Sequence, residues 1–152
     1  LNLEIEKMYS SRLDALQAAI LSVKLPNIIS WTNSRIKNAH YYMEKLQDII
    51  DIELPLIRNN TLHSFHLFVV KVKKRQRLIE FLTENGIATA IHYPTPLPFM
   101  DAYTYLRYKE IDFPLVKSNQ PEILSLPMFP ELTDLQIDYI AAKIKEFYAI
   151  GW

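Results

Sequence analysis

Hydrophobic residues recur every three or four positions in four stretches of this chain, a spacing that predicts amphipathic helices. The predicted helices cover residues 11–25, 28–49, 73–85 and 133–149. The apolar residues expected on one face of the first helix are Leu13, Leu16, Ile20 and Val23. The residues expected to form the buried stripe of the last helix are Leu135, Ile140, Ile144 and Phe147.

Local signals indicate where these helices begin and end. Ser11 is expected to cap the first helix, and Pro26 either ends that helix or opens the second one. Gly86 is expected to close the third helix in a left-handed conformation. The run Thr133-Asp134-Leu135-Gln136 is a capping box, which predicts the start of the last helix.

The period changes after the loop signals at Pro55 and Asn59-Asn60, where β-branched and aromatic residues predict strands. The predicted strands cover residues 65–72, 89–93 and 125–128, and a short aromatic-rich helix or turn is expected at 97–108. This order indicates an α+β fold. We expect a single domain with a small sheet of about three strands, covered by helices and preceded by two long helices.

The charge balance argues against a polyanionic partner. Lys plus Arg and Asp plus Glu both number 17, so the formal net charge is zero. The basic run Lys71, Lys73, Lys74, Arg75 and Arg77 lacks interleaved aromatic residues, so we expect a solvated surface and no nucleic-acid site. No His or carboxylate pair has the spacing of metal ligands, and no metal site is expected.

Cysteine is absent from the sequence, which excludes disulfides and thiolate chemistry and fits a reducing cytosol. No apolar run has the length of a membrane span, and the first residues do not have the apolar core of a signal peptide. We therefore expect a cytoplasmic protein that does not bind membranes. Because the sequence does not begin with methionine, we also expect a fragment or a processed chain.

The candidate binding residues lie in the segment Ile91-His92-Tyr93-Pro94-Thr95-Pro96-Leu97. Prolines at positions 94, 96 and 98 restrict the backbone, so a rigid turn is expected to hold His92 and Tyr93 at the end of a strand. Polar side chains placed in this way are typical of binding sites. The alternative is a structural role for both rings at the edge of the sheet.

Ordered motifs in five segments resemble a known family. The segments are residues 10–21 (SSRLDALQAAIL), 64–70 (SFHLFVV), 86–94 (GIATAIHYP), 112–114 (DFP) and 124–133 (LSLPMFPELT). Together they resemble the DegT/DnrJ/StrS family of pyridoxal-phosphate-dependent aminotransferases, which act on nucleotide-linked keto-sugars. The resemblance implies a small antiparallel sheet with helices packed on one face.

The resemblance also implies that residues 1–152 are the C-terminal small domain of such an enzyme. In the family, an N-terminal large domain provides the Schiff-base lysine and most of the phosphate-binding site for pyridoxal phosphate. That large domain is absent from this sequence, since no lysine has the family's Schiff-base context. The two glycines, Gly86 and Gly151, also exclude a glycine-rich phosphate loop. The chain alone is expected to be inactive.

Two residue pairs receive accessory roles from the resemblance. Ser10 and Arg12 correspond to residues that reach the cofactor phosphate of the neighbouring subunit in a homodimer, although Ser10 replaces the usual asparagine. The alternative for this pair is an ordinary helix cap and a surface arginine. His92 and Tyr93 correspond to the pair that borders the sugar-nucleotide pocket, and Pro98 replaces a second histidine that the family often has.

The resemblance thus implies transfer of an amino group from an amino acid, commonly glutamate, to a keto-sugar nucleotide. Pyridoxal phosphate would be the cofactor of the full-length enzyme. Two non-catalytic alternatives stay open at this point. One is an interaction module that binds a partner through the helical face of residues 11–50, and the other is a carbohydrate-binding domain that retains the sugar-facing loop.

Overall fold

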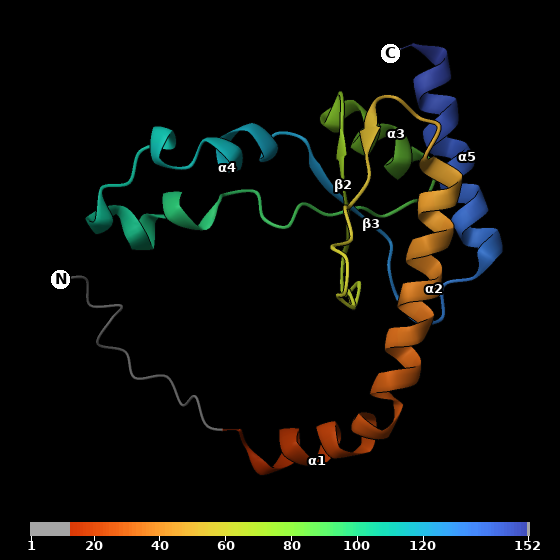
Figure 1. Cartoon of the computed structure of the whole chain (residues 1–152), viewed down its shortest axis with the longest axis vertical. Coiled ribbons are helices and arrows are strands. Elements are labelled where there is room, and N and C mark those ends of the chain that lie inside the picture. Colours follow the sequence, from red (N-terminus) through yellow and green to blue (C-terminus); the bar gives the residue numbers. More distant parts are fainter. Residues whose placement is uncertain (1–12, 152) are drawn as a thin grey trace.

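The structure, a computed structural model, describes residues 13–151 of the chain (Figure 1). Its helices are α1 (Ala15–Lys24), α2 (Ile28–Leu46), α3 (Arg75–Glu84), α4 (Pro114–Asn119) and α5 (Asp134–Ile150). Its strands are β1 (Ile52–Glu53), β2 (Phe68–Val72) and β3 (Ile123–Leu126). Short 3-10 turns cover Leu25–Asn27, Leu97–Phe99, Asp101–Leu106 and Glu110–Asp112. This order of elements confirms the α+β fold.

The three strands form one antiparallel sheet in the order β1-β2-β3. In the central pairing, Phe68 lies opposite Leu126 and Val70 lies opposite Leu124. The predicted number of strands is confirmed, but one strand is not where the sequence placed it. The segment 89–93 contributes a single β-bridge, from Ala90 to Ser125.

The misplaced strand has a physical explanation. The prolines from Pro94 onward lack the amide hydrogens that a longer ladder beside β3 would need. The third strand is instead β1, which spans two residues and is too short to show an alternating pattern. Strand β2 also begins later than predicted, because Phe65 has a φ of 46°, outside the extended region.

The core lies between the sheet and helices α2, α3 and α5. Alternate residues Phe68, Val70 and Val72 of β2 are buried in it, as the two-residue period of a strand requires. The ring of Tyr42 on α2 stacks on Phe68, with ring centroids 4.9 Å apart. Figure 1 shows α2 and α5 running side by side next to the sheet. One face of the sheet is therefore covered by helices.

Helix α5 begins at the predicted capping box, in which Thr133 and Gln136 cap each other's backbone amides. Gly86 follows α3 with a φ of 73°, the expected left-handed conformation. The predicted burial of Leu135 is wrong, since its side chain is 80% exposed. Ile137 is buried in its place. Two residues along a helix correspond to about 200° of rotation, which puts Leu135 on the opposite side from Ile137.

Helix α1 begins later than predicted and packs differently from the other long helices. Asp14 is its cap, and the Asp14 Oδ1 accepts a hydrogen bond of 2.7 Å from the Leu16 amide. Ser11 lies outside the described residues. No residue of α1 is buried. Pro26 sits in the 3-10 turn that joins α1 to α2, where α1 turns away from the axis of α2 (Figure 1).

The basic run around α3 is paired with acids and carbonyls. Lys71 contacts Glu53 at 2.7 Å, Lys73 contacts Glu122, and the Arg75 guanidinium donates to the carbonyl of Ile123 at 3.2 Å. Lys71 and Lys73 thus lie in surface ion pairs, as expected, whereas the guanidinium of Arg75 is partly buried against backbone carbonyls. None of the helices in the described part of the chain is long and apolar enough to cross a membrane.

Candidate functional site

His92 lies beside β3 because a backbone bridge aligns its segment with that strand. The Ala90 amide donates to the Ser125 carbonyl at 3.1 Å, and the Ser125 amide donates to the Ala90 carbonyl at 2.8 Å. Two residues after the bridge, the Nδ1 of His92 lies 2.9 Å from the Oγ of Ser125. Ser125 is buried and His92 is half-buried. The imidazole is therefore anchored on one nitrogen while part of its surface meets solvent.

Tyr93 lies next to His92 and faces outward. The two rings meet edge to face with centroids 5.7 Å apart, and the peptide bond between the residues is cis. The Tyr93 side chain is 69% exposed. The sequence prediction that both rings sit together on a proline-rich turn agrees with this arrangement.

Tyr93 borders a surface groove of about 270 Å³ between the turn and α4. The groove is lined by one hydroxyl, two side-chain amides and several apolar side chains: Tyr93, Asn119, Gln120, Pro96, Leu97, Leu115, Val116 and Ile123. A concave, mostly apolar surface with a few polar groups is typical of ligand-binding sites, although this groove is near the lower end of their usual size.

The loop after Tyr93 is held by a chain of hydrogen bonds. The Nε2 of Gln120 donates to the carbonyl of Pro94 at 2.6 Å. The guanidinium of Arg75, at the start of α3, donates in turn to the backbone carbonyls of Gln120 and Ile123. The end of α4, the start of α3 and the turn beside Tyr93 are thus connected. Sequence reasoning missed Gln120 and Arg75, because neither contact is local in the sequence.

Residues 94–122, called the arm below, project away from the sheet (Figure 1). The arm contains α4 and three 3-10 turns, and it has its own aromatic contacts. The Phe113 ring meets Tyr108 at 5.1 Å and Phe99 at 6.1 Å between centroids. These rings pack within the arm and do not join the core of the sheet.

Ser10 and Arg12, the predicted cofactor-phosphate residues, lie outside the described residues. The nearest described feature is the N-terminus of α1. Its first turn already receives the carboxylate of Asp14, which accepts from the Leu16 amide. A second anion at this helix end would be repelled by the Asp14 carboxylate.

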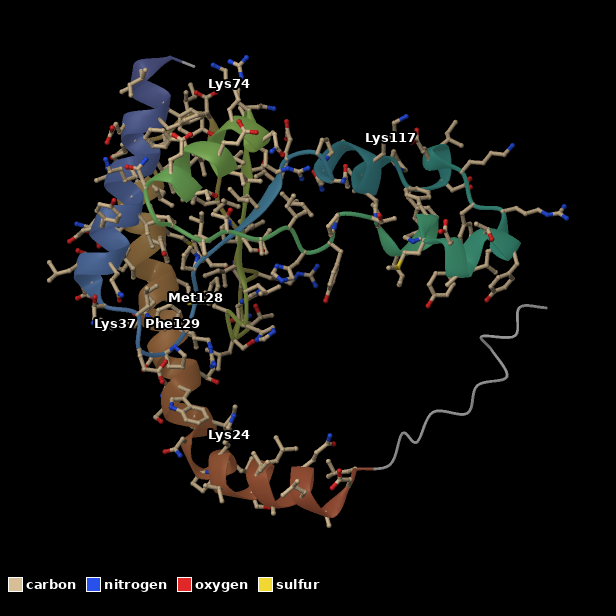
Figure 2. All side chains as sticks on the ribbon, turned by 180° about the vertical axis from the view of Figure 1, so that it is seen from behind. Lys24, Lys37, Lys74, Lys117, Met128 and Phe129 are labelled. Atoms are coloured by element: carbon tan, nitrogen blue, oxygen red, sulfur yellow. The ribbon has the colours of Figure 1, made fainter. Side chains whose placement is uncertain are left out.

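The lysines that the structure describes are distributed over the surface. Figure 2 shows Lys24, Lys37, Lys74 and Lys117 on separate parts of the molecule. The hydrogen bond that Lys73 donates to Glu122 raises the pKa of Lys73, and the hydrogen bond to Glu146 raises the pKa of Lys143. Lys73 and Lys143 are thus each held in an ion pair with an acid of this chain.

Comparison with known proteins places these features in a family context. Residues 4–145 match the model of the DegT/DnrJ/EryC1/StrS aminotransferase family. The "Pleiotropic regulatory protein" of Geobacillus stearothermophilus is 43% identical over 142 residues, which is 92% of this chain and 38% of that protein. The dTDP-3-amino-3,6-dideoxy-alpha-D-galactopyranose transaminase of Aneurinibacillus thermoaerophilus is 35% identical, over 93% of this chain and 38% of that protein.

Solved structures of aminotransferases are also similar to this chain. The crystal structure of S. venezuelae DesV in complex with a ketimine intermediate has a TM-score of 0.84 at 33% identity, over 90% of this chain and 37% of that one. A DegT DnrJ EryC1 StrS aminotransferase from Brucella abortus has a TM-score of 0.80 at 30% identity, over 90% of this chain and 36% of that one. The chain therefore spans less than two fifths of the length of these relatives. It belongs to the DegT/DnrJ/EryC1/StrS aminotransferase family.

Proposed function

We propose that residues 1–152 are the C-terminal small domain of a pyridoxal-phosphate-dependent aminotransferase acting on keto-sugar nucleotides. The family match supports the reaction class, and the small share of each relative that the chain covers supports a domain of a larger enzyme. Two relatives bear the names of a dTDP-amino-sugar transaminase and a UDP-N-acetyl-3-dehydro-alpha-D-glucosamine 3-aminotransferase, which supports a nucleotide-linked sugar as substrate. By the family resemblance, the amino donor is glutamate and the enzyme is a cytoplasmic homodimer.

The observation that carries the proposed substrate role is the pairing of His92 with Tyr93, the residue that borders the groove. The half-buried imidazole lies edge to face with the exposed phenol, and the phenol lines the groove. Imidazole and phenol groups both donate and accept hydrogen bonds, which suits sugar hydroxyls and a diphosphate. In this proposal His92 and Tyr93 bind the sugar nucleotide, and Ser10 and Arg12 reach the cofactor phosphate of the neighbouring subunit.

Pyridoxal phosphate would supply the electron sink for the transfer of the amino group. We assign its binding to the large domain because no lysine of this chain has the sequence context of the family's Schiff-base lysine. The two glycines of the chain, Gly86 and Gly151, also leave no glycine-rich loop for the cofactor phosphate. We therefore also propose that the chain alone does not catalyse transamination.

The experiment compares the chain alone with the chain joined to a large domain of the same family. Transamination of a keto-sugar nucleotide by glutamate is expected only in the joined enzyme. After mixing with pyridoxal phosphate, borohydride reduction and desalting, the chain alone is expected to retain no cofactor at a specific lysine. Stoichiometric labelling of one lysine in the chain alone would overturn the assignment of cofactor binding to the large domain.

A non-catalytic interaction module is the second candidate, favoured by the exposed apolar residues of α1. The two candidate functions predict different activities for the joined enzyme. An interaction module would leave the joined enzyme inactive toward every keto-sugar nucleotide while still binding the large domain. A transaminase domain would restore turnover.

A further inference from the structure

Ser125 is a polar residue at the centre of an apolar strand. Its neighbours Leu124 and Leu126 belong to the helix-covered core. Because successive strand residues point to opposite faces, Ser125 lies on the other face of β3. It is nevertheless only 3% exposed. Burial of a hydroxyl without a partner costs free energy, so its hydrogen bonds determine what the residue does there.

The hydrogen bonds of Ser125 lead to one segment of the chain. Its backbone amide and carbonyl both pair with Ala90, and its Oγ lies 2.9 Å from the Nδ1 of His92. Within residues 13–151, Asn38 and Ser125 are the buried polar residues. The side-chain amide of Asn38 donates to the Phe129 carbonyl, away from the candidate site. Ser125 is therefore the buried polar residue of the described chain whose side chain contacts a candidate binding residue.

The direction of the Ser125–His92 hydrogen bond follows from the protons available. A serine hydroxyl has one hydrogen to donate, and a neutral imidazole has one nitrogen that donates and one that accepts. If the hydroxyl donates to Nδ1, its hydrogen is satisfied and the imidazole carries its proton on Nε2. In the reverse arrangement, the buried hydroxyl hydrogen has no acceptor among the hydrogen bonds found for Ser125 in the described chain.

We propose that Ser125 is a positioning residue that holds His92 in the tautomer with the proton on Nε2, so that the outer nitrogen donates a hydrogen bond to an acceptor oxygen of the bound sugar nucleotide. This inference rests on the proposed function, and it adds the direction of the hydrogen bond at His92. A sugar hydroxyl or a diphosphate provides such acceptors. An imidazole with Nε2 unprotonated could only accept a hydrogen bond there, which a sugar hydroxyl can donate but a diphosphate oxygen cannot.

The tautomer is measurable without any substrate. In the full 152-residue chain labelled with ¹⁵N at histidine, two-bond proton–nitrogen correlations in alkaline buffer report which ring nitrogen carries the proton. His92→Asn identifies the His92 signals among the four histidines. We expect a single Nε2–H form in the unmodified chain and a mixture in Ser125→Ala. A dominant Nδ1–H form, or the same populations in both proteins, would overturn the proposal.

Kinetic measurements on the enzyme that contains this domain test whether the tautomer of His92 affects binding of the keto-sugar nucleotide. Ser125→Ala is expected to raise the KM for the keto-sugar nucleotide roughly three- to tenfold, as expected for one weakened hydrogen bond, with a smaller change in kcat. Ser125→Thr keeps the hydroxyl and should restore the KM. Tyr42→Phe is the matched control, since it removes a buried hydroxyl that donates to Pro127 and has no contact with His92. An equal rise of the KM in Tyr42→Phe would show that lost packing explains the effect and would overturn the proposal.

The two levels of the inference fail in different ways. If His92→Asn leaves the sugar KM unchanged while Ser125→Ala still alters the tautomer of His92, the assignment of His92 to the substrate fails. Ser125 would then still set the tautomer of His92, but His92 would not bind the sugar nucleotide. If His92→Asn raises the KM but Ser125→Ala changes neither the tautomer nor the KM, Ser125 has no positioning role and the proposed function is unaffected.

Discussion

The side chain of Gln120 donates a hydrogen bond of 2.6 Å to the carbonyl of Pro94, which joins the two ends of the arm. Pro94 follows the candidate residue Tyr93, and Gln120 follows α4. Gln120 also lines the groove that Tyr93 borders, so the contact ties one wall of the groove to the residue after Tyr93. It joins positions 26 residues apart in the sequence.

Gln120→Ala is expected to loosen the arm more than the rest of the molecule. Loss of one partly exposed hydrogen bond costs about 0.5–1.5 kcal/mol, which is enough to increase local opening several-fold. Hydrogen exchange should become faster in the arm and stay unchanged in α2 and α5. Asn119→Ala, in the same groove, is the control. Equal acceleration across α5 would show that Gln120 supports the whole fold and would contradict the prediction.

Tyr93→Phe and His92→Asn test the proposed function in the chain joined to a large domain of the same family. Each variant removes one hydrogen-bonding group, so kcat/KM for the keto-sugar nucleotide should fall by roughly tenfold. The half-reaction with the amino donor does not involve the nucleotide and should keep its rate. Tyr105→Phe, an exposed tyrosine on the arm, is the matched control. Lower thermal stability with full sugar kinetics in both variants would favour a structural role for the pair.

The contact between α2 and α5 should depend on pH. The hydrogen bond from Lys45, with a smaller contribution from Tyr41, holds the pKa of Asp138 below its ordinary value of 3.8. A carboxylate with a lowered pKa stabilises the fold above the ordinary value, and this stabilisation is lost as the pH falls through the lowered pKa. The pKa of Lys45 is raised above 10.5, so the lysine stays charged across the neutral range.

Asp138→Asn should therefore unfold at a lower temperature than the unmodified chain at neutral pH. The difference should shrink as the pH falls from 3.8 through the lowered pKa, below which Asp138 of the folded, unmodified chain is also protonated. Thermal unfolding followed by circular dichroism at several pH values measures this difference. Asp48→Asn, an exposed carboxylate just after α2, is the control and should show a smaller difference at neutral pH. A difference for Asp138→Asn that is constant down to acid pH would count against the role of its charge.

The apolar surface of α1 should make the isolated chain associate with itself. Leu16 is 70% exposed and Val23 is 77% exposed, on a helix in which no residue is buried. Clustered apolar exposure marks interaction surfaces more often than free surface. Leu16→Gln should reduce the weight-average mass in sedimentation at high concentration. Leu135→Gln, on the exposed side of α5, should leave it unchanged, and a strictly monomeric unmodified chain would refute the prediction.

Local signals in the sequence predicted local structure well. The capping box at Thr133 and the left-handed Gly86 are set by interactions within a few residues, and both occur where the sequence indicates them. The start of α1 was misassigned because Ser11 and Asp14 are both suitable caps, and Asp14 is the cap in the structure. The buried side of α5 was misassigned at Leu135, because Leu135 lies five residues before Ile140, a spacing that puts the two side chains on different sides of a helix.

Contacts between distant segments were much harder to predict. A single bridge from Ala90 to Ser125 occurs where a strand was predicted. The length of the pairing depends on where the proline-rich turn leaves the sheet, and the sequence does not show that point. The sequence indicated His92 and Tyr93 as neighbours, but it did not indicate the Ser125 hydroxyl under His92. The one available signal was a serine between two leucines in a predicted strand, which becomes informative only when its tertiary partner is known.

The attachment of the arm has a consequence for how this family can diversify. Both ends of the arm meet the sheet at the same edge, through Ala90 on one side and Ile123 on the other. The entropy of closing a loop rises slowly with its length, so residues added near the tip of the arm should cost little stability. The attachment at Ala90 and Ile123 would keep its geometry while the part of the arm that lines the groove changes in size. We expect exchange of arms between relatives to be a practical route to altered sugar preference.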